Sequence, residues 1–179
     1  MTDVPPSPPQ LRHRLGLIPP EPVPRDPVIL ALTADERTRL RGLRHGRDRR
    51  AVLLQLPRGE ALRPGEWLAA EDGLALARVE AAAESLLLVR AAEPLALLQA
   101  AYHLGNRHVA LEVGAGELRL LADPVLEDLL LQRGLEVNHG LEPFHPEPGA
   151  YGGAADHHAH SLPAAALALA DDLSDGVHS

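Results

Sequence analysis

The sequence predicts an α+β protein: a small β-sandwich-like domain at the N-terminus, followed by a ferredoxin-like βαββαβ domain. Three observations support this prediction. Short apolar runs separated by turn-forming residues fill residues 28–79, which is typical of a small sandwich or sheet. Residues 85–142 contain a weak internal repeat of strand and helix signals. Hydrophobic residues make up 45% of the 179 residues, which is enough for a packed core.

The N-terminal half is divided by proline and glycine. Nine of the 17 prolines lie in residues 1–27, and proline removes amide donors and fixes φ, so we expect residues 1–9 to form a flexible arm. A β domain is then expected over residues 10–84, and Thr33 with Glu36 has the pattern of a capped turn or short helix. The expected strands are 11–17, 28–32, 39–44, 51–56, 67–70 and 74–79.

The internal repeat defines a second domain over residues 85–148. Residues 93–105 and 123–134 each begin with an acidic residue and proline and end with glycine, which are helix start and stop signals. Strands are expected at 86–89, 109–113, 117–121 and 135–137, which completes the βαββαβ order. The apolar residues expected on one face of each helix are Leu95, Leu98 and Tyr102 in the first, and Val125, Leu126, Leu129 and Leu130 in the second.

Composition excludes several function classes. The formal net charge of −8 argues against a general binder of nucleic acid or anionic membranes. The chain contains no cysteine, which excludes disulfides and thiolate metal sites, and no lysine, which excludes Schiff-base chemistry. No apolar run is long enough to span a membrane, and no signal peptide is readable, so a cytoplasmic location is expected.

Histidine is the chemically informative residue type. Residues 149–179 are expected to form a flexible tail, and His157, His158 and His160 place three imidazoles within four residues of it. Imidazole is a good ligand for nickel, copper and zinc, and a flexible backbone allows neighbouring rings to converge on one ion. A purification tag and a merely polar tail are the competing interpretations of this cluster.

A second pair of histidines lies at the end of the first predicted helix. His103 and His108 are five residues apart, about 500° around a helix, so the two rings should not chelate one ion. His103 is expected in the last helical turn, where a structural role at the helix C-terminus is the simpler interpretation. His108 is expected on the following loop, as a structural residue or as a metal ligand.

The sequence Tyr-His-Leu-Gly-Asn-Arg-His at 102–108 closely resembles the signature of the UreE family of urease accessory proteins. The resemblance covers about residues 10–160, and this string is its most specific part. Further agreement lies at residues 32–37, 56–59, 116–119, 123–130, 134–137, 143–144 and 149–153, and in the histidine-bearing tail.

This resemblance implies a nickel metallochaperone that delivers Ni²⁺ for urease assembly and performs no catalysis. It further implies an N-terminal domain similar to the peptide-binding β module of chaperones. Homodimerisation through the C-terminal domain would place His108 at the two-fold axis, presented by Gly105, Asn106 and Arg107 and supplemented by the three tail histidines. The implied partners are the GTPase accessory protein UreG and the urease apoprotein with its accessory complex.

The chain departs from some family members in its histidines. Leu121, Ala122 and Pro124 stand where some relatives carry extra histidines, so no auxiliary site is expected there, and the tail has only the cluster and His178. His145 is expected to be a solvated loop residue. The residue pattern does not fix metal selectivity, and Zn²⁺ or Cu²⁺ can substitute for Ni²⁺ at imidazole ligands in vitro.

Two other functions compete with this interpretation. A histidine-dependent metallohydrolase is disfavoured because no HExxH helix pairs two ligands with a general base. A peptide-binding adaptor with a metal-sequestering histidine tail is the closer alternative. Residues 37–50 also contain seven arginines against the single carboxylate of Asp48, which predicts either a solvated strand face or a docking strip for an acidic partner.

Overall fold

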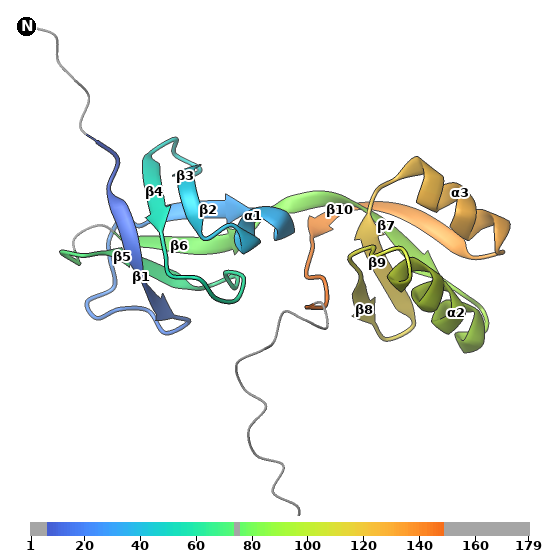
Figure 1. Ribbon diagram of the computed structural model, residues 1–179. Coiled ribbons are helices and arrows are strands. Elements are labelled where there is room, and N and C mark those ends of the chain that lie inside the picture. The colour runs from blue at the N-terminus through green and yellow to red at the C-terminus, as the bar shows by residue number, and fades with distance from the viewer. Residues whose placement is uncertain (1–6, 74–75, 149–179) are drawn as a thin grey trace, which may run out of the picture.

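The computed structural model describes residues 7–73 and 76–148, and it assigns their strands to two sheets (Figure 1). The N-terminal elements are β1 (Gln10–Gly16), β2 (Val28–Leu32), α1 (Ala34–Thr38), β3 (Arg41–His45), β4 (Ala51–Gln55), β5 (Trp67–Ala70) and β6 (Leu76–Ala81). The C-terminal elements are β7 (Ala83–Arg90), α2 (Pro94–Gly105), β8 (Glu112–Gly114), β9 (Glu117–Leu121), α3 (Pro124–Gln132) and β10 (Glu136–Pro143). The predicted α+β class is confirmed.

The N-terminal domain is one mixed sheet of six strands in the order β2-β6-β5-β1-β4-β3. Two pairings are parallel, β1 with β4 and β2 with β6, and the others are antiparallel. In Figure 1 the strands β1, β3 and β4 run across the direction of β2, β5 and β6, so the sheet folds over on itself. The apolar side chains between its two halves form one core, which includes Leu11, Leu30, Leu54, Leu68 and Val79.

A close backbone approach joins the two edges of this sheet. The Arg47 amide donates to the Ile29 carbonyl over 2.9 Å, which connects the hairpin after β3 with β2. Gly46 is required here because a Cβ atom at this position would lie 2.6 Å from Cγ1 of Val28.

The predicted capping box of α1 is also present, since Thr33 Oγ1 accepts from the Glu36 amide and Glu36 Oε2 accepts from the Thr33 amide.

The C-terminal domain has the predicted ferredoxin-like topology. Its antiparallel sheet has the order β10-β7-β9-β8, and the core contains residues of β7 and β9 packed with residues of α2 and α3. Two predicted strands differ in extent, since 109–113 is replaced by the three-residue β8, and 135–137 is the start of the eight-residue β10. The fully buried members of this core are Leu87, Val89, Leu104, Leu120 and Leu130.

The two helix starts differ from each other. Asp123 Oδ1 accepts from the amides of Val125 and Leu126 at 2.8 and 3.0 Å and so caps α3 as predicted. The expectation of a side-chain cap at Glu93 is wrong, because this side chain makes no capping hydrogen bond. The shorter carboxylate of Asp is among the preferred N-cap groups, whereas Glu is not.

A buried arginine connects the two domains. Arg37 of α1 is only 5% exposed, and its guanidinium donates to the carbonyl oxygen of Phe144, just after β10. In Figure 1, α1 lies beside the end of β10. Burial lowers the pKa of Arg37, and the nearby carboxylate of Glu84 opposes this shift. His145, expected to be a solvated loop residue, is exposed, but its Nδ1 lies 3.5 Å from the Arg37 guanidinium.

We expect Arg37→Met to lower the free energy of unfolding by about 2–3 kcal/mol, because it leaves a buried carbonyl without its donor. Urea denaturation measures this change. The matched control is Arg39→Met, whose side chain is 64% exposed and pairs with Asp35, and it should change stability by less than about 1 kcal/mol. Equal small losses in both variants would show that the buried guanidinium does not hold the domains together.

Candidate metal-binding site

The end of α2 is a Schellman turn with a histidine in the left-handed position. The Val109 amide donates to the Leu104 carbonyl at 3.1 Å, and the His108 amide donates to the Gly105 carbonyl at 2.9 Å. His108 has φ 56°, a conformation that usually favours glycine. The helix ends at Gly105 as predicted, but the left-handed cap residue lies three positions further on, at His108.

The residues before His108 form this turn. The Asn106 amide donates to the Tyr102 carbonyl over 3.0 Å, and the Arg107 amide donates to the Leu104 carbonyl over the same distance. The Arg107 guanidinium donates to the His103 carbonyl at 2.9 Å, so a cation satisfies one of the free carbonyls at the helix end. Gly105, Asn106 and Arg107 thus lead directly into the backbone position of His108.

The two histidines of this segment have different surroundings. His103 is half-buried in the last turn of α2, and its ring makes an edge contact with Tyr102 at 5.5 Å between centroids. His108 is exposed, and its ring makes no hydrogen bond, ion pair or ring contact with any residue in 7–73 or 76–148. The imidazole of His108 therefore has both nitrogens available to an external ligand or ion.

The other histidines contribute less to a site within one chain. His139 contacts Glu127 at 2.9 Å, and His13 contacts Glu71 at 3.3 Å. The tail residues His157, His158, His160 and His178 lie outside the described residues. Within the described part of the chain, no group of three His, Asp or Glu side chains is arranged to hold a metal ion.

An apolar stripe on α2 runs toward the histidine turn. Leu95, Leu98 and Tyr102 are 64%, 68% and 67% exposed, so the apolar face predicted for this helix points to solvent rather than to the sheet. The buried side carries Ala100 and Leu104 instead. The inner face is formed by the apolar residues at 96, 97, 100, 101 and 104, and this second helical spacing is the signal in the sequence that could have identified it. The alanines among these residues allow the helix to pack closely on the sheet.

The N-terminus of α3 lies at the same end of the domain. Because β8 and β9 are antiparallel, the start of β8, which follows His108, and the end of β9, which precedes α3, lie side by side. Val125 in the first turn of α3 is 75% exposed. Val125 therefore lies toward the same end of the domain as Tyr102 and His108.

The sheet face opposite the helices carries an ion-pair network. Glu117 accepts from Arg119 at 2.6 Å and from Arg90 at 2.8 Å, and Arg119 also contacts Glu112 and Glu142. The hydrogen bond from Arg119 lowers the pKa of Glu117, and partial burial opposes the shift. These carboxylates are engaged by arginine and are poor candidates for metal ligands.

No helix among the described residues has the length and apolar character to cross a membrane.

The fold and the exposed residues together define a two-domain α+β protein that presents the exposed His108 at the end of a helix. Residues 13–82 match the family described as UreE urease accessory protein, N-terminal domain, and residues 84–168 match its C-terminal domain.

Individual proteins that carry the name of this family are also similar to the chain. A "Urease accessory protein UreE" from Parasynechococcus marenigrum (strain WH8102) is 55% identical over 126 residues, which cover 70% of this chain and 84% of that protein. One of the same name from Burkholderia orbicola (strain AU 1054) is 57% identical over 106 residues, which cover 59% of this chain and 52% of that protein. The aligned part thus spans about half the length of the Burkholderia relative. The chain belongs to the UreE family of urease accessory proteins.

The left-handed backbone at His108 gives a stability prediction. We expect His108→Gly to raise the free energy of unfolding by about 0.5–1 kcal/mol, and His108→Val to lower it by more than about 1 kcal/mol. Gly134, at φ 75° near the end of α3, is the reverse control, and Gly134→Ala should cost about 1 kcal/mol. Thermal unfolding of the variants measures these changes. Equal losses for Gly and Val at position 108 would show that ring contacts, rather than the backbone, determine stability there.

Proposed function

We propose that this chain is a metallochaperone that binds Ni²⁺ as cargo and delivers it for assembly of the urease active site. The observation that carries the proposal is the imidazole of His108, within the most specific motif of the resemblance, which is exposed and has no partner in residues 7–73 and 76–148. Imidazole nitrogen is a suitable donor for Ni²⁺. An exposed ligand on a turn also suits a carrier, because cargo that is held in a closed cage would be released slowly.

One imidazole does not satisfy a nickel ion, and we propose that a second copy of the chain supplies another. In a two-fold homodimer formed by the C-terminal domains, each His108 would meet its symmetry mate at the axis. The apolar stripe of Leu95, Leu98 and Tyr102 supports this arrangement, because large apolar side chains exposed together mark interaction surfaces.

The tail histidines are proposed as supplementary ligands. His157, His158 and His160 would complete the coordination of the ion and then release it to the recipient. Copper binds imidazole more tightly than nickel in the Irving–Williams order, so Cu²⁺ or Zn²⁺ should compete in vitro. Selection of nickel in the cell would then depend on metal availability and on the recipient proteins.

The proposed recipients follow from the role of the family in urease assembly. We propose that the dimer acts in the cytoplasm with the GTPase accessory protein UreG and with the urease apoprotein in its accessory complex. No catalytic step is assigned to any residue of this chain.

The dimer proposal predicts that Leu98→Glu yields a monomer. A carboxylate in the middle of the apolar stripe would have to be desolvated in the interface, which is costly without a partner. Sedimentation velocity measures the change. Ile18→Glu is the control, since Ile18 is an 82% exposed apolar residue of the N-terminal domain, and it should leave the dimer intact. A dimer that persists in Leu98→Glu would contradict the proposed interface.

The role of His108 in delivery is tested by His108→Asn. Asparagine tolerates the left-handed backbone, so this change removes the imidazole and preserves the turn. In cells grown at limiting nickel, we expect urease activity to fall about tenfold or more, because at nickel concentrations below the Kd the loaded fraction of the protein falls in proportion to its affinity.

His103→Asn is the control for this experiment, since His103 is a half-buried histidine of the same motif, and this variant should retain urease activation. Full activation by a dimeric His108→Asn variant would favour the competing adaptor, in which the tail alone sequesters metal.

A further inference from the structure

The arginine-rich segment 37–50 does not form one continuous strip. Arg37 is buried between the domains, and three other arginines are neutralised by carboxylates on the surface. These pairs are Arg39 with Asp35, Arg47 with Glu80, and Arg50 with Asp26 and Asp48. Among the described residues, the arginines of the segment that remain without a carboxylate partner are Arg41 and Arg44 of β3 and Arg49 in the turn after it.

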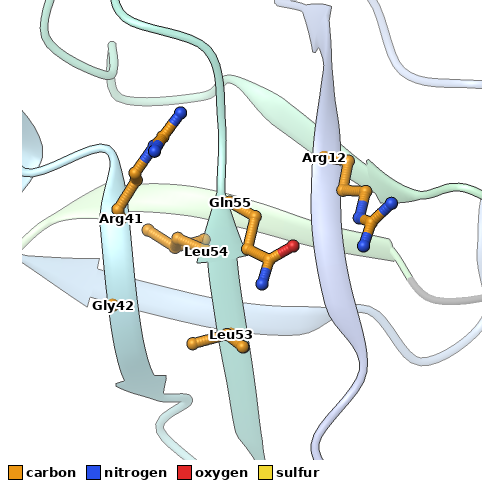
Figure 2. Close-up of a pocket in the computed structure, with 6 residues that line it drawn as sticks. All are labelled: Arg12, Arg41, Gly42, Leu53, Leu54 and Gln55. Atoms are coloured by element: carbon orange, nitrogen blue, oxygen red, sulfur yellow. The ribbon is translucent and has the colours of Figure 1, made fainter.

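Part of that charge lies on the outer face of β1, β4 and β3. Leu54 of β4 and Leu11 of β1 point into the core, so the alternate residues of these strands point outward. Figure 2 shows Arg12 of β1 and Arg41 of β3 on either side of β4, with Gln55 between them. The hollow that these side chains line has a volume of about 590 Å³.

The two arginines at this hollow are poorly compensated. The only hydrogen bond of the Arg41 guanidinium to the described residues is a long one of 3.4 Å to the carbonyl of Leu56. Arg12 donates to the neutral side chain of Gln10 and lies 3.9 Å from Glu71, a carboxylate that is 72% exposed. Each guanidinium retains donors for a further acceptor.

Apolar surface accompanies this charge. Leu43 of β3 is 50% exposed, and it pairs in register with Leu53 of β4, which is half-buried on the same outer face. This aliphatic pair lies one row along the strands from Arg41, Gln55 and Arg12, and apolar surface beside two cations is suited to a ligand that carries both acidic and apolar side chains. These three strands contain no Phe, Tyr or Trp, so the face lacks the large aromatic rings on which nucleic-acid bases usually stack.

The free edge of β3 is covered, which limits how a ligand can bind. The Arg44 guanidinium donates to the carbonyls of Leu43 and Arg39 at 2.8 and 3.0 Å. In the antiparallel pairing with β4, the main-chain groups of these alternate residues point away from β4, so Arg44 blocks the edge against an added strand. A ligand is therefore directed to the sheet face.

We propose that the outer face of β1, β4 and β3 docks an extended acidic segment of a partner protein. Its carboxylates would pair with Arg12 and Arg41, and an apolar side chain would lie over Leu43 and Leu53. β1 and β3 are separated by about 10 Å, which matches carboxylates two or three residues apart in an extended chain. On a chain of net charge −8, a local basic face steers an acidic partner to one place.

This docking surface is independent of nickel, so its test requires no metal. The probe is a fluorescein-labelled peptide, Gly-Glu-Asp-Leu-Asp-Glu-Gly, titrated with the full chain and followed by fluorescence anisotropy. We expect saturable binding that Arg12→Gln and Arg41→Gln each weaken about 3- to 10-fold. Arg133→Gln, an exposed arginine of the C-terminal domain without an ion pair among the described residues, should leave the affinity unchanged.

Three outcomes would overturn the proposal. Unchanged peptide affinity in both Arg12→Gln and Arg41→Gln would show that the peptide binds elsewhere. A 12-residue oligothymidylate that binds more tightly than the peptide through the same arginines would identify a nucleic-acid surface. A rise in peptide affinity after Asp171, Asp172 and Asp175 are replaced by Asn would show that the chain's own acidic end occupies this face.

Discussion

Leu104 connects the hydrophobic core of the C-terminal domain to the histidine on its surface. Its side chain is fully buried beneath α2, and its carbonyl oxygen accepts from the amides of both Arg107 and Val109. The packing of this residue fixes the last turn of the helix against the sheet. Because the Leu104 carbonyl accepts the hydrogen bond from the Val109 amide that closes the Schellman turn, core packing also fixes where His108 emerges. The position of the proposed nickel ligand thus depends on an apolar residue that cannot bind metal.

The two domains place their exposed chemistry on different surfaces. The C-terminal domain presents an imidazole at the end of a helix with an apolar stripe, and the N-terminal domain presents two poorly compensated arginines near two leucines. The buried guanidinium of Arg37 connects the two domains, because it joins α1 to the chain just after β10. We infer that the arrangement separates cargo binding from partner recognition, so that a partner docked on the arginine face leaves His108 accessible.

Much of the fold could be predicted from the sequence because its signals are local. The acidic-residue and proline pairs located both helix starts, and the apolar runs located most strands. The pairing of β1 with β4 in parallel could not be predicted, since it joins segments about forty residues apart without a local signal. Likewise, periodicity identified an apolar face on α2 but not which face meets the sheet, because Leu98 and Leu104 both belong to apolar stripes.

The site shows the same limit. The motif at 102–108 identified His108 as a candidate, yet its left-handed backbone was unexpected because Gly105 carries the stronger turn signal.

The most direct test of the account is a calorimetric titration with Ni²⁺ of the intact protein and, in parallel, of the His108→Asn variant. We predict a tightest step near one nickel per two chains, lost in the variant. A tight site that is unchanged in His108→Asn would contradict a bridging ligand on the dimer axis.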